Sequence, residues 1–350
     1  MTDPADERAS GSTPPRSRAE ARRASENPSL QEHVREARSD FEAQLGKARA
    51  DIELQFGKAR ADFEQANERI NQRTGRNLLM AILIGLALGA ALLGSLLFIK
   101  WLFIVFALPV ALLGIFEFGR ALQAHGRRVD IVPQLVLGGV IILAGYFVGH
   151  WTHWVITFSV VAALVIWRLM AQMTARDGRR YGDVVSDVLV AGLLPLYVAF
   201  LTSLLLALLR EEQGELWVLT MVVIAVASDT GAYASGLAFG RHPMAPRISP
   251  KKTWEGFAGA VVAAAAGGVF MGMFVLQAPW WVGLIFGLAV LLSATIGDLG
   301  ESMIKRDLGI KDMSSWLPGH GGVLDRLDSI LPSTVVALAM YFLFFPQVAA

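Results

Sequence analysis

Charged residues and glycines are concentrated near the C-terminal end of the chain, in the stretch Gly297–Ser329. The stretch holds six acids, four bases and a histidine between two glycines: Asp298, Glu301, Asp307, Asp312, Asp325, Asp328, Lys305, Arg306, Lys311, Arg326 and His320. Carboxylates bind hard metal ions and fixed cations bind phosphates, so this composition indicates metal-assisted phosphate chemistry. A loop that only joins two apolar segments would not need the run HGGVLDRLD.

Three of these acids are predicted to act at the membrane surface. Asp298 lies where a long apolar segment ends, and Asp325 and Asp328 are three residues apart, on one face if their segment begins the last helix. Mg²⁺ prefers one or two carboxylates together with phosphate oxygens and water, so Asp298 and Asp325 are the predicted metal ligands. The neighbouring glycines Gly321 and Gly322 would let the backbone approach an anion closely.

A second polar segment, GRHPMAPRISPKKTWEG, follows an apolar run that ends near residue 239. Ser249 and Pro250 predict a helix start, with Ser249 as the N-cap, so that Lys251, Lys252 and Thr253 fall in the first turn. Exposed amides and two ammonium groups make a phosphate-binding surface. The alternative is that these lysines only contact lipid headgroups.

Asp229 lies inside the apolar run LTMVVIAVASDTGAYASGLAFG. A carboxylate at bilayer depth costs at least about 2.5 kcal/mol unless it faces a polar cavity, which makes Asp229 a functional candidate. The alternative is a structural aspartate that is hydrogen-bonded to a neighbouring helix.

The rest of the chain has the composition of a membrane protein, with 54% hydrophobic and 17% charged residues. There are no cysteines, which excludes disulfides, zinc-thiolate sites and cysteine nucleophiles. We predict an all-α polytopic membrane protein with about nine transmembrane helices. The predicted spans are Leu78–Ile99, Trp101–Phe118, Ile131–Gly149, Trp154–Met170, Val184–Leu209, Leu216–Phe239, Phe257–Leu276, Trp280–Ile296 and Ile330–Phe345.

Basic residues are distributed unevenly among the connections between these spans. Fifteen follow the even-numbered spans, while the opposite side receives only Lys100 and Arg210. By the positive-inside rule, the N-terminus and the polar segments described above are cytoplasmic and the C-terminus is outside.

The N-terminal 77 residues form a polar extension. Residues 1–36 are poor in large apolar side chains and are predicted to be disordered. Residues 37–77 contain three eleven-residue repeats, ARSDFEAQLGK, ARADIELQFGK and ARADFEQANER, which predict an amphipathic helix with a narrow apolar stripe. That stripe would lie on the bilayer or form a coiled-coil seam, and we assign it no chemistry. Residues 78–350 form the predicted transmembrane domain.

The polar segments resemble the motifs of a known family. SMIKR at Ser302–Arg306, KD at residues 311–312 and LPGHGGVLDRLD at residues 317–328 together resemble the signature of the phosphatidate cytidylyltransferases, or CDP-diacylglycerol synthases. DTGAY at residues 229–233 and SPKKTWEG at residues 249–256 are similar to the family's other two blocks. The likeness runs from about Leu78 to the C-terminus.

The resemblance implies the reaction of CTP with phosphatidate to give CDP-diacylglycerol and pyrophosphate. It further implies Mg²⁺ dependence with K⁺ as a candidate second cation, a homodimer among membrane lipids in the cell (inner) membrane, and no nucleic-acid partner. In the predicted roles, Asp298 and Asp325 hold Mg²⁺, and Asp229 and Asp328 orient ligands or a second cation. Six basic residues neutralise phosphates: Lys251, Lys252, Lys305, Arg306, Lys311 and Arg326. His320 with the neighbouring glycines shapes the anion site. The predicted catalytic residues are Asp229, Lys252, Lys305, Arg306, His320, Arg326 and Asp328. The predicted substrate-binding residues are Ser249, Lys251, Lys252, Thr253, Ser302, Lys311, Gly321 and Gly322.

Two other functions are compatible with parts of the sequence. The spacing of Asp183 and Asp187 and the run ARDG at residues 175–178 match fragments of the CDP-alcohol phosphotransferase pattern, although the full motif is missing. In an ion-coupled transporter, Asp229 and Asp298 would be coupling-ion sites. The clustering of charge on one side of the membrane argues against a transporter.

Overall fold

The computed structural model describes residues 46–47, 57–58, 78–175, 178–314 and 321–348. The predicted disordered tail, residues 1–36, lies outside the described residues, and so does most of the predicted repeat helix. Within that repeat, residues 46–47 and 57–58 are helical and exposed.

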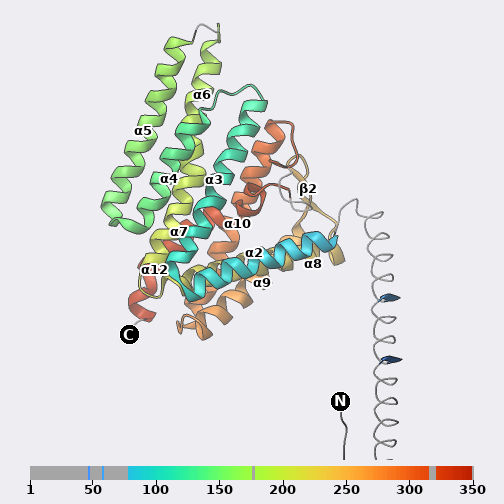
Figure 1. Cartoon of the computed structure of the whole chain (residues 1–350). Coiled ribbons are helices and arrows are strands. Elements are labelled where there is room, and N and C mark those ends of the chain that lie inside the picture. The colour runs from blue at the N-terminus through green and yellow to red at the C-terminus, as the bar shows by residue number, and fades with distance from the viewer. Residues whose placement is uncertain (1–45, 48–56, 59–77, 176–177, 315–320, 349–350) are drawn as a thin grey trace, which may run out of the picture. The chain divides into compact units, whose positions relative to one another are not determined.

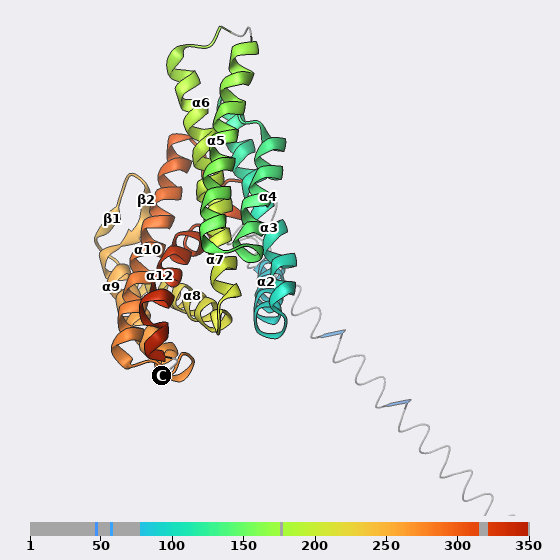
Figure 2. The same cartoon turned by 90° about the vertical axis from the view of Figure 1, so that its left-hand side faces the viewer.

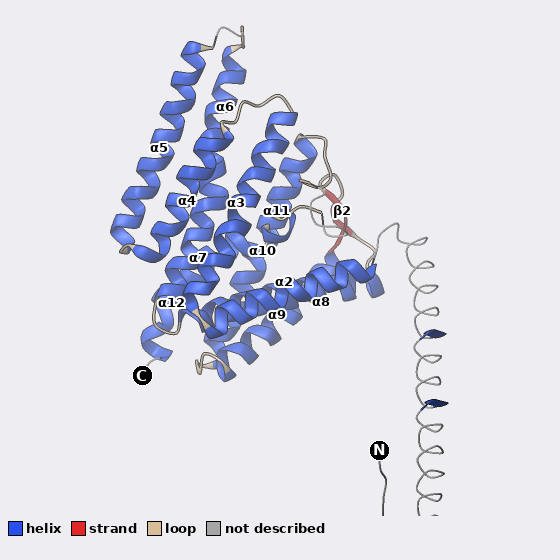
Figure 3. Ribbon diagram, viewed as in Figure 1, coloured by secondary structure: helices blue, strands red, loops and turns tan. Residues whose placement is uncertain are grey.

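From residue 78 onward the described chain is helical apart from one short hairpin, which is coloured red in Figure 3. Each predicted span coincides with an apolar helix or a run of joined helices. These are α2 (Leu78–Phe98), α3 (Lys100–Ala124), α4 (Ile131–Phe147), α5 (His150–Thr174), α6 (Tyr181–Leu194) with η1 (Pro195–Phe200) and α7 (Leu201–Arg210), α8 (Gly214–Phe239), α9 (Trp254–Phe274), α10 (Trp280–Asp307) and α12 (Ile330–Val348).

Seven of these segments are long and apolar enough to cross a membrane, so the chain is a multi-pass membrane protein. The other two are α4 and the described apolar part of α2, Gly89–Phe98. With 17 residues, α4 is only about 25 Å long, somewhat less than the thickness of a bilayer core.

One span is a continuous helical run, Tyr181–Arg210, interrupted by a wider π-helical stretch at Pro195–Phe200. Pro195 has no N–H to donate to the preceding turn, and a π-bulge accommodates this loss without breaking the helix.

Helices α8, α9 and α10 pack closely through small residues (Figures 1 and 2). A Cβ atom added at Gly231 of α8 would lie 2.6 Å from the Cβ atom of Ala263 on α9, and one added at Gly259 would lie 2.8 Å from the Gly231 carbonyl oxygen. Gly268 of α9 and Gly283 of α10 face each other in the same way. Such glycine contacts let membrane helices approach to backbone distance, and here they fix α8 against the start of α9.

An aromatic cluster joins α8, α10 and α12 in the core. Trp217 is fully buried, and its ring centroid lies 5.6 Å from those of both Phe286 and Tyr341. Aromatic pairs at this separation contribute beyond their buried area, so the cluster ties the last helix to the helices of the candidate site.

Ion pairs gather at opposite ends of the helices. At one end Lys100 contacts Glu215 at 2.7 Å and Arg210 contacts Glu211 at 3.1 Å. At the other end, the Arg179 guanidinium donates to the buried Asp187 carboxylate at 2.5 Å. The separation of Lys100 and Arg210 from the other basic residues therefore agrees with the sequence analysis, while the orientation of the two ends in a cell stays a prediction.

The predicted helix start at Ser249 is wrong. Residues Ser249–Thr253 form strand β2, which pairs antiparallel with β1 (Pro243–Ala245), and α9 begins at Trp254. Thr253 is the N-cap, because its hydroxyl oxygen accepts the Gly256 N–H at 3.1 Å. Lys251 and Lys252 consequently lie on a strand and not in a first helical turn.

Glu255 explains why the cap lies four residues later than predicted. Its carboxylate accepts the backbone N–H groups of Arg241 and His242 at 3.1 and 3.2 Å, and it contacts the His242 ring at 2.5 Å. These bonds close the hairpin onto the first turn of α9. Ser249 has suitable cap chemistry, but the hairpin holds it in a strand.

Candidate active site

A cavity of about 520 Å³ lies among α8, β2, α9 and α10. Its polar lining includes Asp229, Lys251, Lys252, Thr253 and Asp298. Its apolar lining includes Leu237, Phe257 and Leu291. A cavity with this mixed lining suits a ligand that has both a charged and an apolar part.

Within the polar lining, Lys252 of β2 forms an ion pair with Asp298 of α10. The Ser302 hydroxyl, one turn further along α10, donates to Asp298 at 3.3 Å. Three segments that the sequence analysis treated separately, around Asp229, Lys252 and Asp298, therefore meet at one cavity.

The Asp325 carboxylate organises the loop that carries the family signature. It accepts the N–H of Gly322 at 2.8 Å and the N–H of Met313 at 3.1 Å, and it lies 3.1 Å from the Lys305 ammonium. Gly321 adopts a φ of 82°, a conformation that favours glycine. Asp325 thus holds both ends of residues 313–322 beside Lys305.

Glu117 of α3 supports the same loop, and the sequence analysis assigned it no role. It is 2% exposed; one carboxylate oxygen accepts the Ser314 hydroxyl at 2.5 Å, and the other accepts the Leu324 N–H at 3.0 Å. A Cβ atom at Gly322 would lie 2.9 Å from the same carboxylate. The available signal was an acid inside a predicted span, which is costly and usually functional.

Glu301 is a second residue that was counted among the acids but given no role. It is 1% exposed and lies 3.5 Å from the Lys305 ammonium. Neither of its carboxylate oxygens accepts a hydrogen bond from a donor N–H or O–H among the described residues, and the carboxyl groups of Asp325 and Asp328 lie beside it. Asp298, Glu301 and Lys305 are spaced three and four residues apart along α10, so this face of the helix joins the cavity to the signature loop.

The short helix α11 (Leu324–Leu327) precedes α12, and Asp328 is its C-cap. The buried Asp328 carboxylate accepts the N–H and the hydroxyl of Ser329 at 2.7 and 3.1 Å. Gly297 of α10 packs directly on the Asp328 carbonyl oxygen. Asp325 and Asp328 therefore belong to one short helical segment beside α10.

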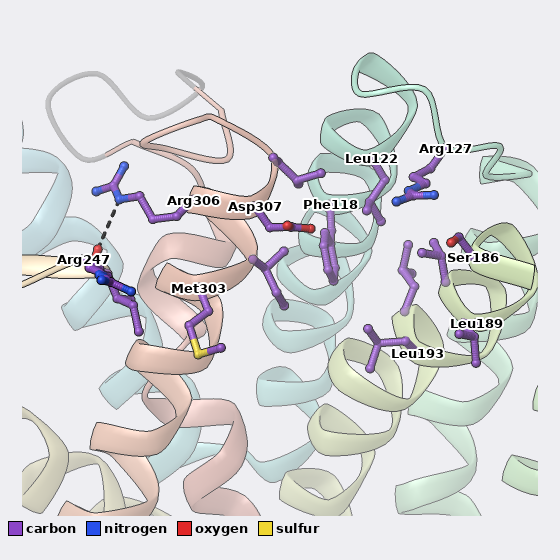
Figure 4. A pocket seen from close by; sticks show the side chains of 15 residues that line it. Phe118, Leu122, Arg127, Ser186, Leu189, Leu193, Arg247, Met303, Arg306 and Asp307 are labelled. Carbon is purple, nitrogen blue, oxygen red and sulfur yellow. Dashed lines mark hydrogen bonds between the residues drawn. The ribbon is translucent and has the colours of Figure 1, made fainter. Parts of the chain in front are cut away.

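Several predicted site residues lie away from this cavity. Arg306 is exposed and donates to the backbone carbonyl groups of Ile248 and Ile310, both at 3.1 Å; the first bond is drawn in Figure 4. Lys311 and Arg326 are exposed and do not line the cavity, and Ser249 is half-buried in β2. His320 lies outside the described residues.

Comparison with known proteins agrees with the resemblance of the motifs. The Cytidylyltransferase family matches residues 79–344. A phosphatidate cytidylyltransferase of Mycobacterium bovis is 38% identical over 280 residues, which cover 76% of this chain and 88% of that protein. Proteins of the same name from Mycobacterium leprae and Helicobacter pylori are each 35% identical, over 77% and 66% of this chain and 88% and 79% of their own lengths.

Proposed function

Because this chain belongs to the cytidylyltransferase family, we infer that it is an enzyme that transfers the cytidylyl group of CTP to phosphatidate, giving CDP-diacylglycerol and pyrophosphate. The observation that carries this conclusion in the structure is the cavity lined by both charged and apolar side chains, which includes the ion pair of Lys252 and Asp298. CTP brings phosphates that suit the charged lining, and phosphatidate brings acyl chains that suit the apolar lining.

The reaction is an in-line displacement at phosphorus. A phosphate oxygen of phosphatidate forms a bond to the α-phosphorus of CTP, and the bond to the bridging oxygen breaks, so that its electron pair leaves with pyrophosphate. The attacking group is already an anion, and no covalent enzyme intermediate is required. The barrier arises from repulsion between anions and from charge on the leaving oxygens, which fixed cations lower.

Lys251 and Lys252 are the proposed cations for the substrate phosphates, because both line the cavity. Lys252 already contacts a carboxylate, so an incoming phosphate would exchange one anion for another at its ammonium group. Lys305 is proposed to neutralise charge from the side of the signature loop, where it lies between Glu301 and Asp325.

The residues fit the proposed Mg²⁺. The buried Glu301 carboxylate accepts no hydrogen bond from a described N–H or O–H donor and lies beside the carboxyl groups of Asp325 and Asp328, so this region provides oxygen donors suited to a cation. Mg²⁺ usually takes one or two carboxylates and completes its shell with phosphate and water. We propose that Asp298 and Asp325 hold it; when bound, the ion neutralises phosphoryl charge.

Other parts of the proposal extend the same chemistry. Asp229 and Asp328 orient ligands or hold K⁺ as a second cation, and Arg306, Lys311, Arg326, His320 and the neighbouring glycines shape the anion environment. The enzyme acts as a homodimer in the cell membrane, with the site and the N-terminus on the cytoplasmic side, where most of the basic residues are expected.

The test is pyrophosphate release by the purified protein in mixed micelles, with CTP, phosphatidate and Mg²⁺ omitted in turn. We expect release only when all three are present. Release without phosphatidate would indicate hydrolysis of CTP, and release of CMP from CDP-diacylglycerol and an alcohol would indicate a phosphotransferase. Either result would contradict the proposed reaction.

A further inference from the structure

A second cavity, of about 720 Å³, lies among α3, α6, the end of α10 and the hairpin loop (Figure 4). It shares no lining residue with the cavity at Lys252 and Asp298. The first cavity borders α10 at residues 291–298, whereas this one borders the end of α10 at residues 303–307 and its C-cap, Leu308. The two cavities are therefore separate, and Arg306 is the one residue proposed for the reaction that lines this second cavity.

The walls of the second cavity are mostly apolar and reach the membrane-facing surface. Phe118 and Leu194 are buried and form its inner side. Leu189, Leu193 and Met303 line it as well, although they are 67, 48 and 56% exposed. Large apolar side chains this exposed on transmembrane helices contact lipid chains, so a chain could enter the cavity from the bilayer.

The polar lining carries three arginines and one acid. Arg127 follows α3, Arg247 lies in the hairpin loop, and Arg306 and Asp307 end α10. Arg306 is held by two backbone carbonyl groups, and none of the three guanidinium groups is ion-paired with a carboxylate in the described part of the chain. Figure 4 shows Arg127 and Arg306 on opposite sides of the cavity, above Leu193 and Met303.

We propose that this cavity binds one anionic phospholipid as a second, non-reacting lipid site. The phosphate lies between Arg127, Arg247 and Arg306, and one acyl chain lies along Leu189, Leu193 and Met303. The three guanidinium groups against one carboxylate favour an anion, and arginine donates two parallel hydrogen bonds to phosphate oxygens. The arginines and the apolar side chains line the same cavity. A phospholipid contacts both, whereas a free phosphate would use only the charged lining and an uncharged chain only the apolar lining.

The experiment is a lipid titration of the full-length protein in a nonionic detergent, followed by native mass spectrometry and thermal unfolding. The probe is phosphatidylglycerol, an anionic diester that is not a substrate of the proposed reaction, and the comparison lipid is phosphatidylcholine. We expect one tightly held phosphatidylglycerol per chain and a higher unfolding temperature, with a much weaker effect of phosphatidylcholine. Because no turnover is measured, the outcome is independent of the proposed function.

Variants locate the site. Arg127→Gln and Arg247→Gln should each weaken phosphatidylglycerol binding by about fivefold, a typical effect of one cation near a membrane surface. Arg241→Gln is the matched control, because it removes the same charge from the exposed start of the hairpin, outside the lining of the cavity. Leu193→Trp should weaken binding by filling the apolar part while keeping every charge.

Three results would overturn the proposal. Equal binding of the two lipids would show that the phosphate is not recognised by charge. Equal losses in Arg127→Gln and Arg241→Gln would place the lipid elsewhere. A lipid-free dimer that Leu193→Trp dissociates would show that a second copy of the chain covers this surface.

Discussion

Replacing Glu117 by alanine should disable the enzyme from a distance, because this one side chain accepts hydrogen bonds from both ends of the signature loop. The change removes the acceptors of the Ser314 hydroxyl and of the buried Leu324 N–H. Loss of the acceptor of the buried Leu324 N–H costs about 1–3 kcal/mol, and loss of the bond to Ser314 costs about 0.5–1.5 kcal/mol. The two losses together weaken the closed loop by about 2 kcal/mol or more, which corresponds to a decrease in kcat/KM of about 30-fold.

Glu117→Gln is the conservative variant in this series. Its amide oxygen can still accept the Leu324 N–H, and its NH₂ group can donate to the Ser314 hydroxyl oxygen, so both bonds survive in a neutral form. The loss is then about 1 kcal/mol, or roughly fivefold in kcat/KM. We therefore expect both the activity and the resistance of the loop to proteolysis to decrease from wild type to Glu117→Gln and further to Glu117→Ala.

The assay is pyrophosphate release at varied CTP and phosphatidate, with thermal unfolding in the same detergent. Glu215→Ala is the matched control, because Glu215 pairs with Lys100 at the opposite end of the helices. The control should lose some stability and keep its turnover per folded molecule. If Glu117→Ala kept kcat/KM within twofold of wild type, the role assigned to Glu117 would be refuted.

Three further predictions concern the cavity and its supporting helices. Lys252→Met should reduce pyrophosphate release at least 100-fold, because it removes the ammonium group that pairs with Asp298 in the cavity lining; normal release would show that this lysine does not contact phosphate. Asp298→Asn should abolish turnover while the protein stays folded in detergent, and an active variant would remove Asp298 from the proposed metal site. Gly259→Ala should destabilise the protein by about 1–3 kcal/mol through contact with α8, measured by thermal unfolding. Gly267→Ala is its control, because the nearest atom to an added Cβ lies 3.6 Å away, and equal effects would contradict the packing argument.

The helices and the grouping of motifs could be predicted because their causes are local. Long apolar runs must form helices in a bilayer, and all nine predicted spans do so in the described chain. The distribution of arginine and lysine predicted which helix ends lie on the same side of the membrane. Charge and the family motifs identified Lys252 and Asp298 as site residues, and the structure brings these two residues into contact.

The misplaced helix start and the overlooked acids have non-local causes. Ser249 has the side chain of an N-cap, but pairing with Pro243–Ala245 places it in a strand. Glu117 is separated from Ser314 by 197 residues, so no spacing rule connects them. In the sequence, Glu301 resembles an ordinary charged residue near a helix end, whereas in the fold its side chain is buried. An acid within or beside an apolar span was the only local signal for Glu117 and Glu301.

The bond between Glu117 and Leu324 also sets an order of events during synthesis of the chain. The two residues are 207 positions apart, and ribosomes add about 5–20 residues per second, so α3 is made about 10–40 s before its partner on the loop. Throughout that interval the Glu117 carboxyl group has neither of its native donors. The signature loop can close on Glu117 only after Leu324 has been made, so this contact forms after helices α3 to α10 have been synthesised.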